Sequence, residues 1–132
     1  MSYKVESIFI KKGLSSFRLG KEVLHVDVSK ERHEELPGPA ELLLTAFSSC
    51  ILKNIERFSE ILKFKYEKVS IHVEADRQES PPKFTEIRYV VTLNTSEDQH
   101  RIDLLHKNIK KFGTVYNSLS KEMRIVGQIT KV

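Results

Sequence analysis

Apolar and polar residues alternate in several parts of the chain, which is the pattern of strands with one buried face. Near the N-terminus this pattern predicts short strands around turns at Gly13 and Gly20. In the second half it predicts a hairpin with a loose, proline-containing connection, followed by a strand at the end of the chain. The expected strand regions are residues 3–11, 16–28, 69–75, 87–93 and 123–132.

A different pattern, apolar and uncharged over eleven residues, predicts a long helix in the first half of the chain. The stretch GPAELLLTAFSSC provides Gly38 as a helix N-cap, Pro39 as the first helical residue and Glu41 as a first-turn carboxylate. We expect the helix to continue to about Phe64, which gives it a length of nearly 40 Å at about 1.5 Å per residue. Its second half is amphipathic, whereas LLLTAFSSCIL carries no charge.

Two shorter helices complete the set of expected elements. Ser96 and Gln99 form a capping-box pattern for the first of them, and Gly113 is placed to end it. Residues 114–122 suit the second. The resulting order, β-β-β-α-β-β-α-α-β, predicts an α+β fold with an antiparallel-rich sheet around a long central helix.

Length and composition restrict the classes of protein that fit. A chain of 132 residues suits one domain over residues 1–132. No apolar run approaches the roughly 20 residues of a membrane span, so we expect no membrane partner. A single cysteine allows no internal disulfide, and the first residues lack the pattern of a signal peptide. We therefore expect a cytoplasmic protein.

The charge pattern argues against a nucleic-acid partner. The formal net charge is +4, and basic and acidic residues are interspersed along the chain. A nucleic-acid binder more often gathers its basic residues in one stripe, with stacking aromatic residues among them.

The uncharged half of the long helix predicts a second copy of the chain. One chain of this size covers one face of that helix with its strands and leaves the opposite face apolar and open. An open apolar face of this kind marks an interface. We therefore expect a homodimer with two-fold symmetry.

Cys50, the single thiol, is the strongest candidate for chemistry, and its sequence context leaves two interpretations open. Free cysteine is among the most buried residue types, so Cys50 fits a core position in a helix. It also fits a nucleophile, because a thiol reacts with peroxide as the thiolate. The helix dipole field fades after the first turn, so a reactive Cys50 requires a nearby cation.

No other residues form a convincing site. The histidines show no metal-ligand spacing, and we expect neither a metal nor a cofactor. Arg77 lies at the end of an expected strand. Two interpretations stay open: its side chain faces the site, or it is an exposed arginine without a functional role. The five histidines are His25, His33, His72, His100 and His106.

Three stretches resemble the OsmC-like family, which includes the osmotically induced protein C and the organic hydroperoxide resistance proteins. GPAELLLTAFSSC is similar to the family's Pro-x-Glu-Leu-Leu-Leu run, which ends in a helix cysteine. EADRQESPPKFTEIRYVVTL is similar to its strand, arginine, proline-rich loop and second strand. KKFGTVYNSLSK matches the region of the family's second cysteine, where this chain has Gly113.

The resemblance implies an intertwined homodimer with two active sites at its interface and a thiol-dependent reduction of organic hydroperoxides. It places Cys50 at the peroxide-attacking position, and Arg18 is the nearest candidate for the family's catalytic arginine. Glu41 matches the glutamate of other branches, whereas the hydroperoxide resistance branch has its glutamate at the position of Ala40. We take Arg77 and Phe47 as candidate substrate contacts.

The glycine at position 113 leaves two functions open. The first is a one-cysteine peroxidase that takes a small hydroperoxide and depends on an external thiol as reductant. The second is a non-catalytic relative that binds a small apolar or thiol-bearing ligand in the interface pocket. Glu41 lies nine residues before Cys50, on the opposite side of a regular helix, so the two side chains can meet only across a dimer or through an irregular first turn.

Overall fold

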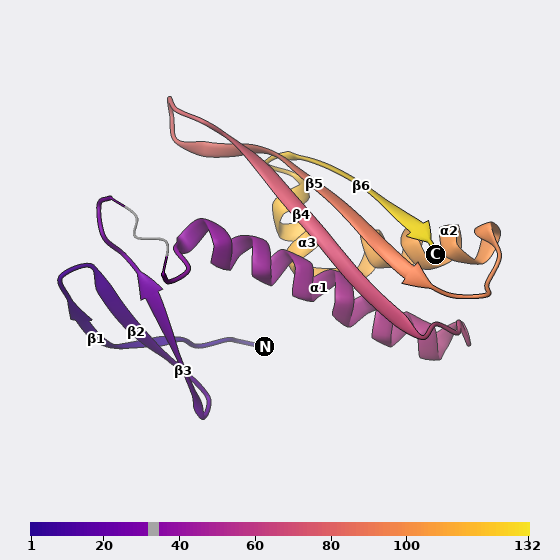
Figure 1. Cartoon of the computed structure of the whole chain (residues 1–132), viewed down its shortest axis with the longest axis horizontal. Coiled ribbons are helices and arrows are strands. Elements are labelled where there is room, and N and C mark those ends of the chain that lie inside the picture. Colours follow the sequence, from indigo (N-terminus) through magenta and orange to yellow (C-terminus); the bar gives the residue numbers. More distant parts are fainter. Residues whose placement is uncertain (32–34) are drawn as a thin grey trace. The chain divides into compact units, whose positions relative to one another are not determined.

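The secondary-structure elements of the computed structural model follow the predicted order, β-β-β-α-β-β-α-α-β (Figure 1). The structure describes residues 1–31 and 35–132. The chain forms two units, Met1–Leu43 and Leu44–Val132. The predicted α+β class is therefore confirmed.

The N-terminal unit contains an antiparallel three-stranded sheet. Its strands are β1 (Glu6–Lys11), β2 (Leu14–Leu19) and β3 (Glu22–Asp27), with β2 in the middle. Between β1 and β2, Lys12 and Gly13 have positive φ angles of 47° and 81°, as the tight turns of two-residue hairpins require. Gly20, with φ 62°, makes the second turn. Both glycine turns expected from the sequence are present.

The second unit contains another three-stranded sheet. Strands β4 (Lys68–Gln78) and β5 (Lys83–Asn94) form the predicted antiparallel hairpin. Strand β6 (Arg124–Lys131) pairs with β5 in parallel, since the two helices between them carry the chain back to the start of the sheet. The strands thus form two antiparallel-rich sheets, of which this one has a parallel edge.

Three helices complete the fold: α1 (Pro39–Ile61), α2 (Gln99–Phe112) and α3 (Thr114–Ser120). In the second unit, the part of α1 from Leu44 onward, α2 and α3 pack with one face of the β4–β6 sheet (Figure 1). The inward residues of α1 recur every three or four positions, as an amphipathic helix requires. The largest fully buried side chains of this core are Phe47, Ile51, Ile55, Ile87, Leu93, Ile102, Leu105 and Ile109.

Two expected helix ends were wrong. The helix expected to reach about Phe64 ends at Ile61. The expected cap of α2 at Ser96 is also incorrect, because the cap is Asp98, whose side chain accepts a hydrogen bond from the backbone N–H of Arg101 at 2.9 Å. Ser96 lies two residues before this cap, outside the helix.

Gly127 allows an unusually close approach between β6 and its neighbour. A Cβ atom at this position would lie 2.1 Å from the ring of Tyr89 on β5. Only glycine fits beneath that ring, and the ring in turn covers the gap that glycine leaves in the strand. The Tyr89 ring also contacts Phe47 of α1 and His106 of α2.

Candidate functional site

Cys50 lies on α1, half-buried, with its sulfur close to the junction of α2 and α3. A Cβ atom built on Gly113 would lie 3.2 Å from Cys50 Sγ. Residues far apart in the sequence therefore meet at the thiol. The position where the resemblance expects a second cysteine is directly beside the first.

Gly113 does not end α2 in the way expected. Its φ of −77° and ψ of 117° are extended, whereas the helix-stop role of glycine depends on the left-handed region. A Cβ at this position would also approach Tyr116 Cβ at 3.0 Å and the Ile109 carbonyl oxygen at 3.2 Å. The glycine is therefore explained by close packing between the helix junction and the thiol, and not by backbone conformation.

Asn54 is the site residue that the sequence interpretation missed. Its amide nitrogen lies 3.0 Å from the Cys50 carbonyl oxygen and 3.8 Å from Cys50 Sγ. The side chain is only 6% exposed and lies between the buried Ile51 and Ile55. The sequence did contain one sign of this residue, because an amide stands on the apolar stripe of the helix one turn after the cysteine.

Phe47 lies one turn before the thiol and is fully buried. Its ring stacks on Tyr116, with 5.8 Å between the ring centroids, and meets the Tyr89 ring edge-on at 5.7 Å. Through these contacts the Phe47 side chain packs between α1 and the β4–β6 sheet. Its expected role as a substrate contact stays a prediction.

The Tyr89 ring, which is buried, also contacts the half-buried His106 on α2. The Tyr89 hydroxyl and His106 Nε2 are 2.6 Å apart. Burial raises the pKa of Tyr89 well above its ordinary value and lowers the pKa of His106 to about 4, with a smaller contribution from Lys110. His106 is therefore neutral at neutral pH and supplies no cation.

Arg77, one of the two expected arginines, makes no hydrogen bond or ion pair with Cys50. Arg77 is exposed at the end of β4, where its guanidinium lies 2.9 Å from Glu79. Within Leu44–Val132, where every residue is described, Asn54 is the one side chain with a hydrogen bond to Cys50 Sγ.

Arg18 and Glu41 belong to the unit Met1–Leu43. Arg18 is exposed on β2. The Glu41 carboxylate accepts a hydrogen bond from the Gly38 backbone N–H at 2.9 Å, which is the reciprocal half of a capping box. This contact supports the expected stabilising role of Glu41 in the first turn, and roles for both residues at the thiol stay predictions.

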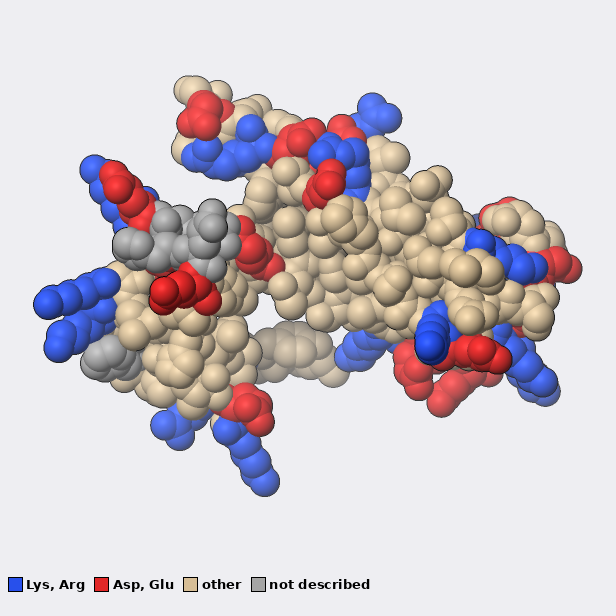
Figure 2. Space-filling model, in the orientation of Figure 1, with Lys and Arg blue, Asp and Glu red and all other residues tan. Residues whose placement is uncertain are grey.

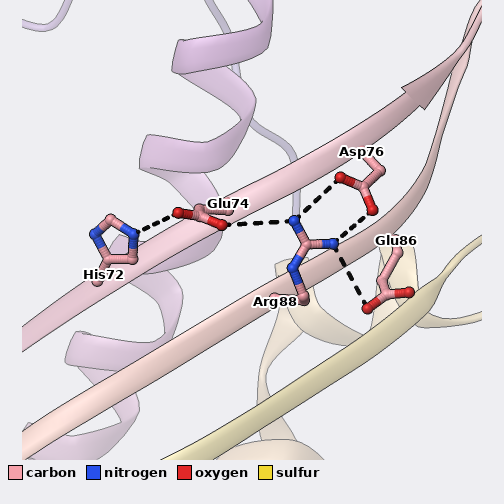
Figure 3. A network of polar contacts seen from close by, with 5 residues as sticks. All are labelled: His72, Glu74, Asp76, Glu86 and Arg88. Atoms are coloured by element: carbon pink, nitrogen blue, oxygen red, sulfur yellow. Dashed lines mark hydrogen bonds and ion pairs between the residues drawn. The ribbon is translucent and has the colours of Figure 1, made fainter.

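His72 belongs to a separate, exposed network on the open face of the sheet (Figure 3). It lies 3.0 Å from Glu74, and Arg88 bridges Glu74 to two further carboxylates, Asp76 at 2.6 Å and Glu86 at 3.7 Å. Hydrogen bonds from His72 and Arg88 lower the pKa of Glu74, and those from Arg88 lower the pKa of Asp76. The helices and the thiol lie beneath the other face, so this network aligns β4 with β5.

Three further expectations concern metal ligands, membrane spans and surface charge. His33 lies outside the described residues, and in the rest of the chain no three His, Cys, Asp or Glu side chains gather as a metal site. No described helix has the length and apolar character needed to cross a bilayer. Figure 2 shows basic and acidic side chains interspersed, without a basic stripe on the face it displays.

Solved structures share this fold over nearly the whole chain. An OsmC-like protein from Mycoplasma pneumoniae is 14% identical, with a TM-score of 0.91, over 100% of this chain and 98% of that one. An organic hydroperoxide resistance protein from Legionella pneumophila is 15% identical, with a TM-score of 0.78, over 98% and 97%. OhrB, an organic hydroperoxide resistance protein of Bacillus subtilis, is 13% identical, with a TM-score of 0.72, over 98% of both chains.

The sequence comparisons add the family. A search of curated proteins finds no match. The sequence model described as "OsmC-like protein" matches residues 8–126, which include both Cys50 and Gly113. By this match and the fold, the chain belongs to the OsmC-like protein family.

Proposed function

We propose that the protein reduces organic hydroperoxides with Cys50 as its one redox-active thiol. The observation that carries the proposal is the half-buried sulfur beside Gly113, at the α1–α2–α3 junction of an OsmC-like fold. Two structures that share this fold are named organic hydroperoxide resistance proteins. The stacked rings of Phe47, one turn before Cys50, and Tyr116, next to Gly113, supply apolar surface near the thiol, which suits the organic part of such a substrate.

The proposed reaction begins with the Cys50 thiolate. The thiolate attacks one peroxide oxygen, the O–O bond breaks, and the leaving alkoxide takes up a proton to become an alcohol. Sulfur loses two electrons and becomes a sulfenic acid. A small external thiol then condenses with the sulfenic acid, releasing water and forming a mixed disulfide. A second thiol reduces that disulfide and regenerates Cys50.

An external reductant is needed because Cys50 is the only cysteine. A reducing cytoplasm supplies small thiols, so the proposal includes a cytoplasmic location. Without an internal partner, excess peroxide is expected to drive the sulfenic acid to sulfinic acid, which small thiols do not reverse. Turnover therefore depends on thiol from the start and falls with each peroxide pulse.

The proposal also includes a homodimer. Thr45, Ala46 and Ser49 are exposed on the uncharged half of α1, whereas Phe47 and Ile51 are buried on its inner side. A second copy covers the exposed side and brings a cation, for which Arg18 is the first choice, to the thiol. Light scattering tests this part, and a stable monomer at micromolar concentration would contradict it.

The test of the activity compares an organic hydroperoxide with hydrogen peroxide in the presence of dithiothreitol. We expect faster consumption of the organic substrate and a sulfenic-acid adduct on Cys50 by mass spectrometry. Cys50→Ser is the control and is expected to lose both signals. If Cys50 stays unmodified while the cysteine of the unfolded chain oxidises, the peroxidase function is wrong.

A second candidate is a non-catalytic protein that binds a small apolar or thiol-bearing ligand beside Cys50. It is favoured by the lack of a cation bonded to the sulfur within Leu44–Val132, all of whose residues are described. An unreactive thiol in the test above, together with saturable binding of a small apolar molecule, would support it.

A further inference from the structure

We propose that Asn54 stabilises the Cys50 thiolate by donating a hydrogen bond to the sulfur. The inference deepens the proposed function, on which it rests, by assigning a group that acts on the reacting atom. Asn54 Nδ2 is 3.8 Å from Cys50 Sγ and 3.0 Å from the Cys50 carbonyl oxygen. This nitrogen carries two hydrogens, so it serves both acceptors at once.

The position of Asn54 is unfavourable unless its amide has a task. Asparagine is a weak helix former, and burying an amide in apolar surroundings costs free energy when its hydrogen bonds are incomplete. Yet the side chain is 6% exposed and lies in the middle of α1, among residues that form the core. A leucine would suit this stripe better if packing alone decided the residue.

The bond to the carbonyl oxygen does not explain the residue. Inside a regular helix the carbonyl of residue 50 already accepts the backbone N–H of residue 54, so the side-chain bond is additional. The sulfur has no such backbone donor. An amide N–H directed at sulfur gains strength when the thiol loses its proton, because hydrogen bonds to charged groups are about twice as strong as neutral ones.

The amide is suited to this role because it stays a donor at every pH of interest. The other titratable groups of the neighbouring turns are Tyr116, whose pKa is raised by burial, and five exposed residues: Lys53, Glu56, Arg57, Lys110 and Lys111. A substitution at Asn54 leaves all of them in place. A change in thiol reactivity can then be assigned to the amide.

The experiment measures alkylation of Cys50 by iodoacetamide at about pH 7 and about pH 9.5, where an ordinary thiol is mostly ionised. We divide the rate at the lower pH by the rate at the higher pH, and this ratio reports how readily the thiolate forms at neutral pH. A change that affects only the access of iodoacetamide to Cys50 alters both rates equally and cancels in the ratio. Asn54→Leu is close in size and has no donor. We expect its ratio to be about fivefold to tenfold lower than that of the wild type.

Asn108→Leu is the matched control. Asn108 donates the same kind of bond, from Nδ2 to the Leu104 carbonyl oxygen at 2.9 Å, on a helix without a thiol. We expect the wild-type ratio for this variant. Asn54→Ala, which favours the helix, lacks the same donor and replaces Asn54→Leu if circular dichroism shows that leucine disturbs folding.

Each outcome of this experiment either supports or contradicts the proposed role of Asn54. A lower ratio in a folded Asn54 variant, with a wild-type ratio for Asn108→Leu, supports the role of Asn54. Equal ratios in all folded proteins overturn it. Peroxide consumption is measured on the same samples, so that a lowered alkylation ratio without any peroxide turnover would reject the peroxidase proposal and keep the role of Asn54.

Discussion

At the scale of single residues, the thiol site depends on contacts that no local pattern contains. The resemblance to the OsmC-like family pointed to both Cys50 and Gly113 from the sequence. Periodicity could not place them together, because they meet only when the α2–α3 junction packs against α1. Asn54 was missed for a related reason: a polar residue on an apolar stripe gives no sign of its partner until the helix is built.

The geometry at Gly113 predicts that a cysteine there will form a disulfide with Cys50. A Cβ at position 113 would be 3.2 Å from Cys50 Sγ, and a disulfide places each Cβ about 3 Å from the partner sulfur. The backbone there is extended, so a side chain causes no backbone strain. We expect Gly113→Cys to lose both free thiols after mild oxidation and to gain about 2–4 kcal/mol of stability over its reduced form.

The measurements for this variant are a thiol count and denaturant unfolding with and without reductant. Gly113→Ser is the control, since it adds a similar side chain that cannot be oxidised. The disulfide should also slow the formation of sulfinic acid at Cys50 under peroxide. Two thiols that persist in the folded, oxidised variant would show that Tyr116 and the Ile109 carbonyl do not admit the side chain.

At the scale of elements, strands were easier to predict than helix ends. The alternation in β4 and β5 matches their buried faces. Successive side chains of a strand point to opposite faces, so the sequence position of a residue alone predicts which face it lies on. Helix ends depend on a few backbone hydrogen bonds and are less visible. Asp98 competed with Ser96 as the cap of α2, and the end of α1 carries no glycine at all.

The end of α1 predicts a stabilising substitution. Lys63 has a φ of 52°, its N–H bonds to the Glu60 carbonyl at 3.3 Å, and the Phe64 N–H bonds to the Ser59 carbonyl at 2.8 Å. This is the Schellman arrangement, in which the left-handed residue is usually glycine. Lys63→Gly should therefore raise the free energy of unfolding by about 0.5–1 kcal/mol, measured by urea denaturation.

Lys63→Ala separates the backbone effect from the loss of the lysine side chain. It removes the same charge but keeps a Cβ atom in the left-handed region, so we expect no gain. Equal stabilisation by glycine and alanine would mean that the charge, and not the backbone strain, was responsible.

At the scale of the whole molecule, element order and fold class were predictable, whereas the pairing of β6 and several buried polar groups were not. The chain returns to β5 in parallel through two helices, and only the complete sheet shows this. His106 had no visible partner in the sequence. In the structure His106 lies within hydrogen-bonding distance of Tyr89, and the Tyr89 ring packs on Gly127. Residues of α2, β5 and β6 therefore determine the surroundings of His106.

His106 gives the stability of the molecule a defined dependence on pH. Its pKa is about 4 in the folded protein, against 6.5 ordinarily, chiefly because burial disfavours the charged ring. Between these two values the unfolded chain binds more protons than the folded one, so stability falls as the pH falls from 6.5 towards 4. Above pH 6.5 the contribution is fully present. Because the ring is partly exposed, we expect a loss of about 1–2 kcal/mol, less than the full shift would give.

His106→Gln tests this dependence, because glutamine keeps a hydrogen-bonding group near Tyr89 but does not titrate. Urea denaturation between about pH 7 and about pH 4 should show a loss of stability in the wild type that exceeds the loss in the variant by about 1–2 kcal/mol. The carboxylates Glu74 and Asp76, whose pKa values are lowered, also respond to acid, but they are the same in both proteins, so their effect cancels in the difference. Replacement of the exposed His100 on the same helix by glutamine is the matched control. If wild type and His106→Gln lose stability in parallel, this half-buried histidine is not what makes the fold sensitive to acid.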